Sequence, residues 1–253
     1  MTVVVFVGPT LHGEDPSTVL DASYRPPAAQ GDVVRAVLDE QPRVIGIIDG
    51  FFERVPSVWH KEILWAMARG VHVFGAGSIG ALRAAELAAF GMEGVGKVYQ
   101  AFAAGHLEDD DEVAIIHAPG GYQYRPMSEA MVDVRATMSA AEAAGIVSTR
   151  SHRTVVHAAK SLFYRDRLYP RILRAALDLG ADPTEIQALQ AYLPNGRVGQ
   201  KRADALEMLA TIKLRLDEGL ESKRVDYTFQ CSQHFYRALS DAGALDCSPS
   251  TGP

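Results

Sequence analysis

Residues 74–86 read FGAGSIGALRAAE, and this stretch decides the fold. It follows the apolar run 71–74, which predicts a buried strand, and it opens an amphipathic segment that predicts a helix over 79–90. Gly91 ends that helix, because glycine accepts the left-handed conformation that closes a helix. A strand that turns through glycines directly into a helix is typical of α/β proteins.

The same alternation runs through the first half of the chain. Short apolar runs predict strands that are covered on both faces, and amphipathic segments predict helices between them. The predicted strands are 2–7, 43–49, 71–74 and 113–117, and the predicted helices are 32–40, 58–69 and 79–90. Strands that are joined through helices pair in parallel. The fold class is therefore α/β, with a mostly parallel sheet and flanking helices in the N-terminal half.

The second half carries almost no strand signal from residue 128 onward. Helical periodicity runs through 131–144, 154–163, 170–179, 183–192 and 201–216. Asp182 followed by Pro183 is a strong helix start, since proline suits the first helical position. These patterns predict three parts, which are an α/β core over 1–125, a helical region packed on it over 126–241, and a mobile tail over 242–253.

The composition favours a cytoplasmic protein that binds neither nucleic acid nor membranes. The chain has 253 residues and a formal net charge of −6, so its bulk charge repels anionic nucleic acids and lipid surfaces. The apolar run at the N-terminus is far too short to span a bilayer, and no signal-peptide pattern surrounds it. A local basic patch is still compatible with these totals.

The glycine-rich turn has two functional interpretations. In the first, Gly75, Gly77 and Gly80 form a GxGxxG loop, in which the backbone approaches the pyrophosphate of a dinucleotide. That pattern also needs an acidic residue about 20 positions further on, at the end of the next strand. The matching region, 97–100, ends without one. We therefore keep dinucleotide binding as the weaker alternative and expect no cofactor and no metal.

In the second interpretation, residues 76–80 form a nucleophile elbow around Ser78. The usual pattern is GxSxG, and alanine replaces the first glycine here as another small residue. A sharp turn of this kind lifts a serine hydroxyl clear of the sheet. The N–H groups of Ile79 and Gly80, at the start of the helix, could then stabilise an oxyanion. The plain structural alternative is that Ser78 only caps its helix.

A nucleophilic serine needs a base, and two candidates precede the turn. The strand 43–49 and the helix 58–69 meet at the edge of the sheet where Ser78 lies, so His60 and Lys61 are expected near it. Asp49 or Glu62 could orient His60, whereas Lys61 would act as a neutral amine. Arg83 and Glu86, on the helix after Ser78, are further supporting candidates. The plain alternatives are a solvated lysine and a surface histidine.

Two charged stretches lie further along. Residues 108–112 read EDDDE, and we expect them to form a solvated loop and not a Mg²⁺ site. The second stretch is basic within an acidic protein, which suggests either a solvated helix face or a docking surface for an acidic partner. It contains Arg150, His152, Arg153, His157, Lys160, Arg165 and Arg167.

Several motifs together resemble the TfuA-like family. They are FVGPTL at 6–11, IIDGFF at 47–52, VWHKEIL at 58–64, GAGSIGALRAAEL at 75–87 and FGM at 90–92, with QKRADA at 200–205 as a looser match. The resemblance is strong over residues 2–98. It departs from the family at Gly77, where many members carry serine.

The resemblance implies a role in peptide backbone thioamidation. TfuA-like proteins work with YcaO enzymes, which use ATP to activate a peptide amide. They resemble hydrolases with a Ser-Lys pair that release sulfide from the C-terminal thiocarboxylate of a ThiS-like carrier protein. Carried onto this chain, the serine is Ser78 and the first candidate for the lysine is Lys61, with Lys160 and Lys201 as alternatives. A non-catalytic scaffold between YcaO and the carrier is the alternative function.

Overall fold

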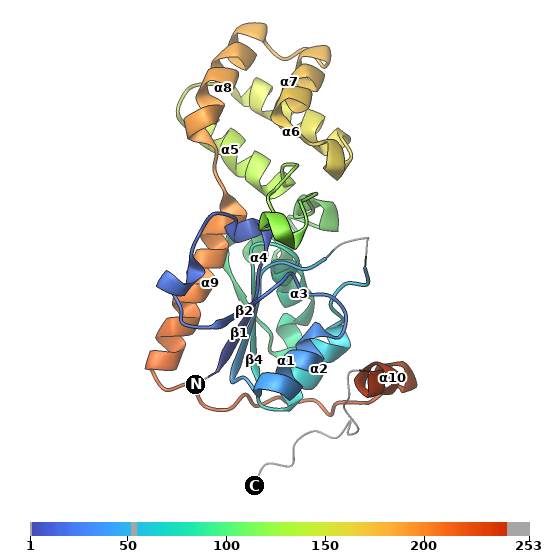
Figure 1. The fold of residues 1–253 in the computed structure, drawn as a ribbon. Helices are drawn as coiled ribbons and strands as arrows, with labels where there is room; N and C mark the ends of the chain where they lie inside the picture. The colour runs from blue at the N-terminus through green and yellow to red at the C-terminus, as the bar shows by residue number, and fades with distance from the viewer. Residues whose placement is uncertain (1, 52–54, 242–253) are drawn as a thin grey trace. The chain divides into compact units, whose positions relative to one another are not determined.

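The computed structural model describes residues 2–51 and 55–241 and divides the chain into two compact units. The first unit contains residues 1–107 and 203–253, and the second contains residues 108–202. Figure 1 shows the first unit as the sheet with its helices and the second as a group of helices. The tail predicted over 242–253 and Phe52 of the 47–52 motif lie outside the described residues.

The first unit is built on a five-stranded sheet in which every pair of neighbours is parallel, as the sequence predicted. The strand order is β2-β1-β3-β4-β5. The strands are β1 (Val3–Phe6), β2 (Ser23–Arg25), β3 (Val44–Ile47), β4 (His72–Ala76) and β5 (Glu93–Val95). This order is one of the common doubly wound arrangements, in which helices cover both faces of the sheet.

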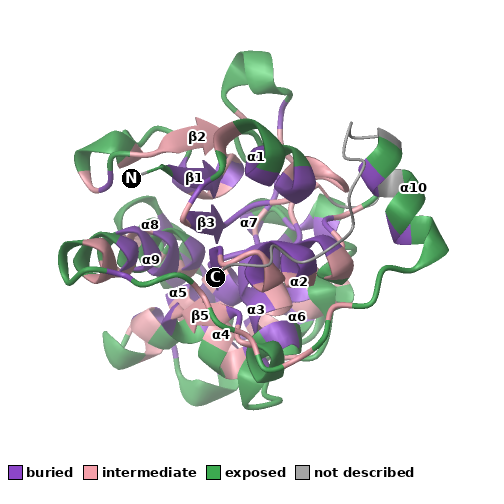
Figure 2. Cartoon of the chain, turned by 90° about the horizontal axis from the view of Figure 1, so that it is seen from below, coloured by how far each residue is buried: buried purple, intermediate pink, exposed green. Residues whose placement is uncertain are grey.

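Both faces of the sheet are buried because successive side chains of a strand point to opposite sides. Val4 and Phe6 face one cluster, and Val3 and Val5 face another. The first cluster includes apolar residues of α1 (Asp32–Glu40), α2 (His60–Ala68) and α3 (Ile79–Leu87). The second includes α9 (Gln200–Asp217), whose Met208 and Ile212 also fill the space above Gly46. Figure 2 shows β1 and β3 buried between these layers.

The ends of three strands meet at one edge of the sheet, which we call the C-terminal rim. After β1 the chain crosses to β2 on one side, whereas after β3 it crosses to β4 on the other. The carboxyl ends of β1 and β3 therefore flank a topological switch point, where ligands bind in open α/β sheets. The residues that follow these strands are Val7–Thr10 after β1, Ile48–Gly50 after β3 and Gly77–Ser78 after β4.

The remaining helices of the first unit surround this sheet. The element α4 (Gly96–Ala103) follows β5, and α10 (Gln233–Asp241) inserts Phe235 and Leu239 into the cluster beneath α2. Short 3-10 turns, η1 (Pro9–Leu11) and η2 (Pro16–Thr18), connect β1 to β2, and η3 (Ala88–Phe90) ends α3 at Gly91. Among the described helices, none combines the length and the apolar character that a bilayer crossing requires.

The second unit is helical, as predicted. Its core joins α5 (Met131–Ala143), α6 (Thr149–Ser161), α7 (Tyr169–Asp178) and α8 (Pro183–Gly196). The side chain of Ser148 caps α6, and that of Asp182 accepts from Thr184 and Glu185 at the start of α8, which is the start signal identified in the sequence. Three further 3-10 turns are η4 (Asp110–Glu112), η5 (Gly120–Tyr122) and η6 (Tyr164–Asp166).

The strand predicted over 113–117 is wrong. Val113 follows η4, and His117 makes only an isolated bridge with Pro126. Val113 and Ala114 are buried, but the amide of Ile116 donates to the Ser128 hydroxyl and not to a neighbouring strand. An apolar run becomes a strand only where another strand pairs with it. The sequence analysis also missed β2 and β5, which are three-residue strands at the two edges with half-buried side chains.

Candidate functional site

The turn after β4 bends within one residue. The amide of Ser78 donates to the carbonyl of Ala76 at 2.7 Å, and Gly77 between them has φ +68°. This is a γ-turn of the strained kind, and a residue without a Cβ adopts it most easily. The sharp strand-to-helix turn predicted from the sequence is therefore present. Its left-handed residue is Gly77, whereas Ser78 has φ −122°.

The hydroxyl of Ser78 has no partner within the described residues. Ser78 stands at the N-cap position of α3, yet its side chain accepts no hydrogen bond from the helix. Serine at this position usually satisfies an amide of the first turn, so the capping role proposed as the plain alternative is not fulfilled by the side chain. Ser78 is 8% exposed, at the C-terminal rim beside the end of β3.

Only one of the two predicted oxyanion donors is available. The Gly80 amide donates to the Ile48 carbonyl at 3.2 Å, which ties the start of α3 to the end of β3. The prediction that Gly80 supplies an oxyanion donor therefore conflicts with a hydrogen bond that the fold already uses. The amide of Ile79 has no acceptor among the residues that the structure describes, as expected for the first residue of a helix.

Close packing accounts for the outer glycines of the GxGxxG pattern. A Cβ on Gly75 would lie 2.1 Å from the carbonyl oxygen of Gly80, and a Cβ on Gly80 would lie 1.7 Å from that of Ile47. Both distances are far below van der Waals contact, so α3 approaches β3 and β4 only because these positions are glycine. The region 97–100, compared above with a strand end, lies within α4. All three glycines therefore have a role in the fold itself.

Asp49 joins the two loops at the switch point. Its carboxylate accepts the amides of Gly8 at 2.9 Å and Thr10 at 3.0 Å, and the Thr10 hydroxyl at 2.6 Å. Asp49 is 2% exposed. The FVGPTL and IIDGFF motifs thus meet in one hydrogen-bonded structure. The geometry gives Asp49 the role of holding the loop after β1, in place of the predicted contact with His60.

Glu62 links the starts of two helices. Its carboxylate accepts the amides of Gly31 and Val33, at the start of α1, and that of Trp59, at the start of α2. Burial raises the pKa of Glu62 to about 7, although these amides oppose the shift. The side chain that was predicted to orient His60 points into this junction instead.

His60 pairs with Glu86. The imidazole Nε2 lies 2.8 Å from Glu86 Oε2, and Arg83 Nη1 donates to the same oxygen at 2.6 Å. Arg83 Nε also donates to the Val58 carbonyl at 3.2 Å. Burial opposes ionisation of Glu86, but His60 and Arg83 outweigh it and lower its pKa. Glu86 is eight residues beyond Ser78, which is about 12 Å along a helix. His60, Arg83 and Glu86 therefore do meet one another, but at the second turn of α3 and not beside Ser78.

Lys61 is engaged by the C-terminal segment. Its Nζ donates to the carbonyl of Gln230 at 2.7 Å and lies 5.3 Å from the centre of the Phe229 ring. Phe229 in turn contacts Phe235 of α10. The amine of Lys61 is thus held by a carbonyl oxygen and the face of an aromatic ring. Within the described residues, neither Lys61 nor His60 forms a hydrogen bond to Ser78.

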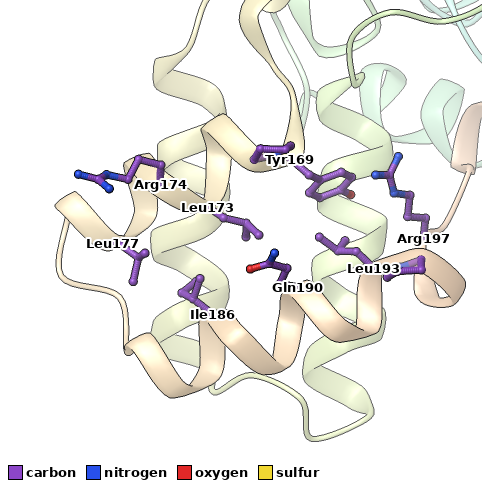
Figure 3. Close-up of a pocket in the computed structure, with 10 residues that line it drawn as sticks. Tyr169, Leu173, Arg174, Leu177, Ile186, Gln190, Leu193 and Arg197 are labelled. Carbon is purple, nitrogen blue, oxygen red and sulfur yellow. The ribbon is translucent and has the colours of Figure 1, made fainter.

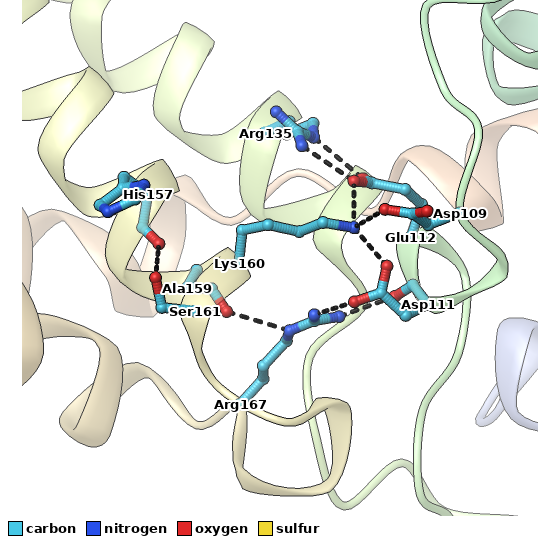
Figure 4. Close-up of polar contacts among 9 residues, drawn as sticks. All are labelled: Asp109, Asp111, Glu112, Arg135, His157, Ala159, Lys160, Ser161 and Arg167. Atoms are coloured by element: carbon cyan, nitrogen blue, oxygen red, sulfur yellow. Dashed lines mark hydrogen bonds and ion pairs between the residues drawn. The ribbon is translucent and has the colours of Figure 1, made fainter.

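The alternative lysines are occupied inside the second unit. Lys160 Nζ forms ion pairs with Asp109, Asp111 and Glu112, which Figure 4 shows converging on it. Burial opposes the charge, but these carboxylates outweigh it and raise the pKa of Lys160. Lys201 is 3% exposed and donates to the carbonyl of Val113 at 2.9 Å. Lys160, which its three carboxylates hold as an ammonium, is therefore unsuited to accept a proton.

The acidic run is only in part the solvated loop that we expected, because residues 108–110 are exposed whereas Asp111 and Glu112 are held by ion pairs. Arg135 donates to both oxygens of Glu112, at 2.9 and 2.8 Å, and the fully buried Arg167 bonds the carboxylate and the carbonyl of Asp111. Two members of the basic stretch, Lys160 and Arg167, thus form ion pairs with the acidic run, whereas Arg150 and Arg153 are exposed. No cluster of His, Cys, Asp and Glu suited to a metal occurs in the described part of the chain.

Comparison with known proteins finds a family match over part of the chain. No curated protein matches it. The family model described as TfuA-like protein matches residues 49–168. The match begins at Asp49 and contains the turn at Ser78, the start of α2 and the acidic run. Over residues 49–168 the chain is thus similar to TfuA-like proteins, which confirms the resemblance that its motifs predicted.

Proposed function

We propose that this TfuA-like protein assists a YcaO enzyme in peptide backbone thioamidation, and that it hydrolyses the C-terminal thiocarboxylate of a ThiS-like sulfur carrier. The family supports the first part, because the TfuA-like match covers the C-terminal rim residues that follow β3 and β4. The second part depends on Ser78. Its hydroxyl carries no hydrogen bond within the described residues and lies at the edge of the sheet where ligands bind.

The reaction needs few groups from the protein. The Ser78 oxygen attacks the thiocarboxylate carbon and its proton passes to a base. The base then gives this proton to the sulfur as the C–S bond breaks, which yields an acyl-serine and hydrosulfide. Water then hydrolyses the ester to a carboxylate and regenerates the hydroxyl. In this proposal the amide of Ile79, which has no acceptor among the described residues, binds the oxyanion at the start of α3. Hydrosulfide leaves readily, so a dedicated general acid is not required.

Lys61 is the proposed base, and it serves only when its amine leaves the carbonyl of Gln230. That contact joins residues far apart in the chain, so the C-terminal segment controls whether the amine is available. His60 is the second candidate, and it would have to leave Glu86. A neutral amine or imidazole is needed in either case, because only an unprotonated group accepts the serine proton.

The test is sulfide release from a thiocarboxylated carrier protein, measured colorimetrically with Ser78→Ala, Lys61→Ala and His60→Ala. We expect Ser78→Ala and one of the two base variants to lose at least a hundredfold in rate, since general-base catalysis contributes about that much or more. Ser161→Ala is the matched control, because Ser161 is an exposed serine of the second unit that bonds the carbonyl of His157.

A non-catalytic scaffold is the second candidate, and two hydrogen bonds favour it. The Gly80 amide and the Lys61 amine, both needed for the full hydrolase arrangement, are used within the fold. A scaffold predicts that Ser78→Ala supports thioamidation by the YcaO enzyme at the wild-type rate. Unchanged sulfide release by folded Ser78→Ala protein would reject Ser78 as the nucleophile, whereas no sulfide release by the wild-type protein would leave the scaffold.

A further inference from the structure

The last described part of the chain, residues 221–241, lies along α2, and we call it the strap. Figure 1 shows it as the orange-red stretch that ends in α10. The amide of Lys223 donates to the carbonyl of Gly70, just beyond the end of α2, at 2.9 Å. The hydroxyl of Tyr227 donates to the carbonyl of Leu64, in the middle of α2, at 2.7 Å. The strap therefore approaches the start of α2 as it proceeds.

The next contact of the strap holds the amine that we propose as the base. Lys61 lies in the first turn of α2, and its Nζ donates to the carbonyl of Gln230 at 2.7 Å. The ring of Phe229 lies 5.3 Å from the same nitrogen. The three contacts follow one another in order, so the strap runs antiparallel to α2 from the end of the helix to its start.

The helix α10 fixes the strap beside Lys61. Phe235 and Leu239 of α10 are 1% and 0% exposed, and both belong to the apolar cluster beneath α2. The ring of Phe235 lies 6.3 Å from that of Trp65 and 5.3 Å from that of Phe229. The aromatic ring that covers the Lys61 amine is thus held in place by an anchor of α10.

The strap can open without the rest of the first unit. Over 223–229 half-buried side chains alternate with exposed ones, as in an extended strand, yet residues 221–232 belong to no described helix or strand. The helix α10 has nine residues, and a helix as short as this does not form in water unless it is docked. Segments that lack regular backbone hydrogen bonds open locally, while the remainder of the protein stays folded.

We propose that the strap is an autoinhibitory element, which withholds the amine of Lys61 while α10 is docked and frees it when α10 is released. The carbonyl of Gln230 has to separate from Nζ before the amine can accept a proton from Ser78. The inference rests on the proposed function where it names Lys61 as the base, and it adds how that base is controlled.

Acetylation of individual lysines of the full chain, followed over time by mass spectrometry, measures whether the amine is withheld. Lys213 is the internal reference, because it is an exposed lysine of α9. In the wild-type protein we expect Lys61 to react about tenfold more slowly than Lys213. Phe235→Ala removes an anchor of α10 and should raise the rate at Lys61 about fivefold or more, with no change at Lys213.

Two control variants separate release of the strap from a general loss of stability. Tyr236→Ala changes the neighbouring residue of α10, which is 49% exposed, and should leave the rate at Lys61 as in wild type. Leu193→Ala truncates a buried side chain of the second unit, where Leu193 lines the pocket between α7 and α8 (Figure 3), and it too should leave Lys61 protected. Tyr227→Phe is a milder opening variant, because it removes one hydroxyl and leaves the ring, and it should raise the rate at Lys61 about twofold.

Sulfide release by the same proteins shows whether the strap inhibits hydrolysis. We expect Phe235→Ala to release sulfide about fivefold faster than wild type, in proportion to the exposed amine. Equal acetylation of Lys61 in the wild-type, Tyr227→Phe and folded Phe235→Ala proteins would overturn the strap. Faster acetylation with unchanged sulfide release would overturn its inhibitory role and leave hydrolysis at Ser78 intact. Faster acetylation with no sulfide release from any protein would reject the hydrolase and uphold the control of the amine by the strap.

Discussion

The carboxyl group of Glu62 gives the structure a distinctive dependence on pH. Burial raises its pKa from 4.5 to about 7 in the folded chain, so the folded state binds this proton more tightly than the unfolded state does. Its stabilising effect is therefore complete below pH 4.5 and is lost as the pH rises to about 7. A shift of about 2.5 units corresponds to about 3 kcal/mol in the free energy of unfolding.

Replacing Glu62 by glutamine removes this titration. The amide oxygen can still accept from Gly31, Val33 or Trp59, but the side chain stays neutral at every pH. We expect the free energy of unfolding of Glu62→Gln, relative to that of wild type, to increase by about 3 kcal/mol between pH 4.5 and pH 8, because only wild type loses stability over this range. Urea unfolding at four pH values measures the difference, followed by the fluorescence of Trp59 and Trp65, the two tryptophans of the chain.

Glu86→Gln is the control with the opposite sign. The pKa of Glu86 is lowered, so the stability it contributes is present above pH 4.5 and lost only as the pH falls through its folded pKa. Its difference from wild type should stay constant between pH 5 and pH 8. If Glu62→Gln behaves in the same way, the three amides outweigh burial, Glu62 is ionised throughout, and the reasoning is refuted.

Two further substitutions test the packing and the ion pairs. Gly80→Ala should destabilise the first unit by about 3 kcal/mol in urea unfolding, because its Cβ meets the Ile47 carbonyl at 1.7 Å, whereas Gly121→Ala, with open space around it, should change little. Equal effects of the two would contradict the glycine assignment. Lys160→Met should cost about 2 kcal/mol at pH 7 because it removes the cation that three neighbouring carboxylates share, and Arg174→Met, from an exposed pair, should cost less than about 0.5 kcal/mol. An equal loss from Lys160→Met in a chain that already carries Asp111→Asn and Glu112→Gln would show that charge is not its cause.

The central elements of the fold could be predicted because their local signals agree with their packing. Buried parallel strands appear as continuous apolar runs, and β1, β3 and β4 lie where such runs predicted them. The edge strands could not be found in this way, since β2 and β5 have three residues each and half-buried side chains. The run 113–117 has the composition of a strand but no neighbour to pair with, and that depends on distant parts of the chain.

The position of the candidate site in the sheet could be predicted from the sequence, but the hydrogen-bond partners of its residues could not. Topology alone placed Asp49 and Ser78 at the C-terminal rim, and glycine spacing predicted the tight turn. The partner of each charged side chain could not be predicted, because the partners come from remote segments. Gln230 lies 169 positions beyond Lys61, and Gly8 lies 41 positions before Asp49. Nothing in the sequence around Lys61 or Asp49 indicates that the carbonyl of Gln230 or the amide of Gly8 will form a hydrogen bond with it.

The discontinuity of the first unit has a consequence during synthesis. Val3, Val5 and Ile48 lie under Met208 and Ile212, which the ribosome adds some 160 to 200 residues later. Until α9 has emerged from the ribosome, one apolar face of the nascent sheet is exposed to water. At ordinary elongation rates this delay lasts on the order of ten seconds or more. A ribosome-bound chain halted before residue 205 should therefore be far more sensitive to protease than one halted after the full helix has left the exit tunnel.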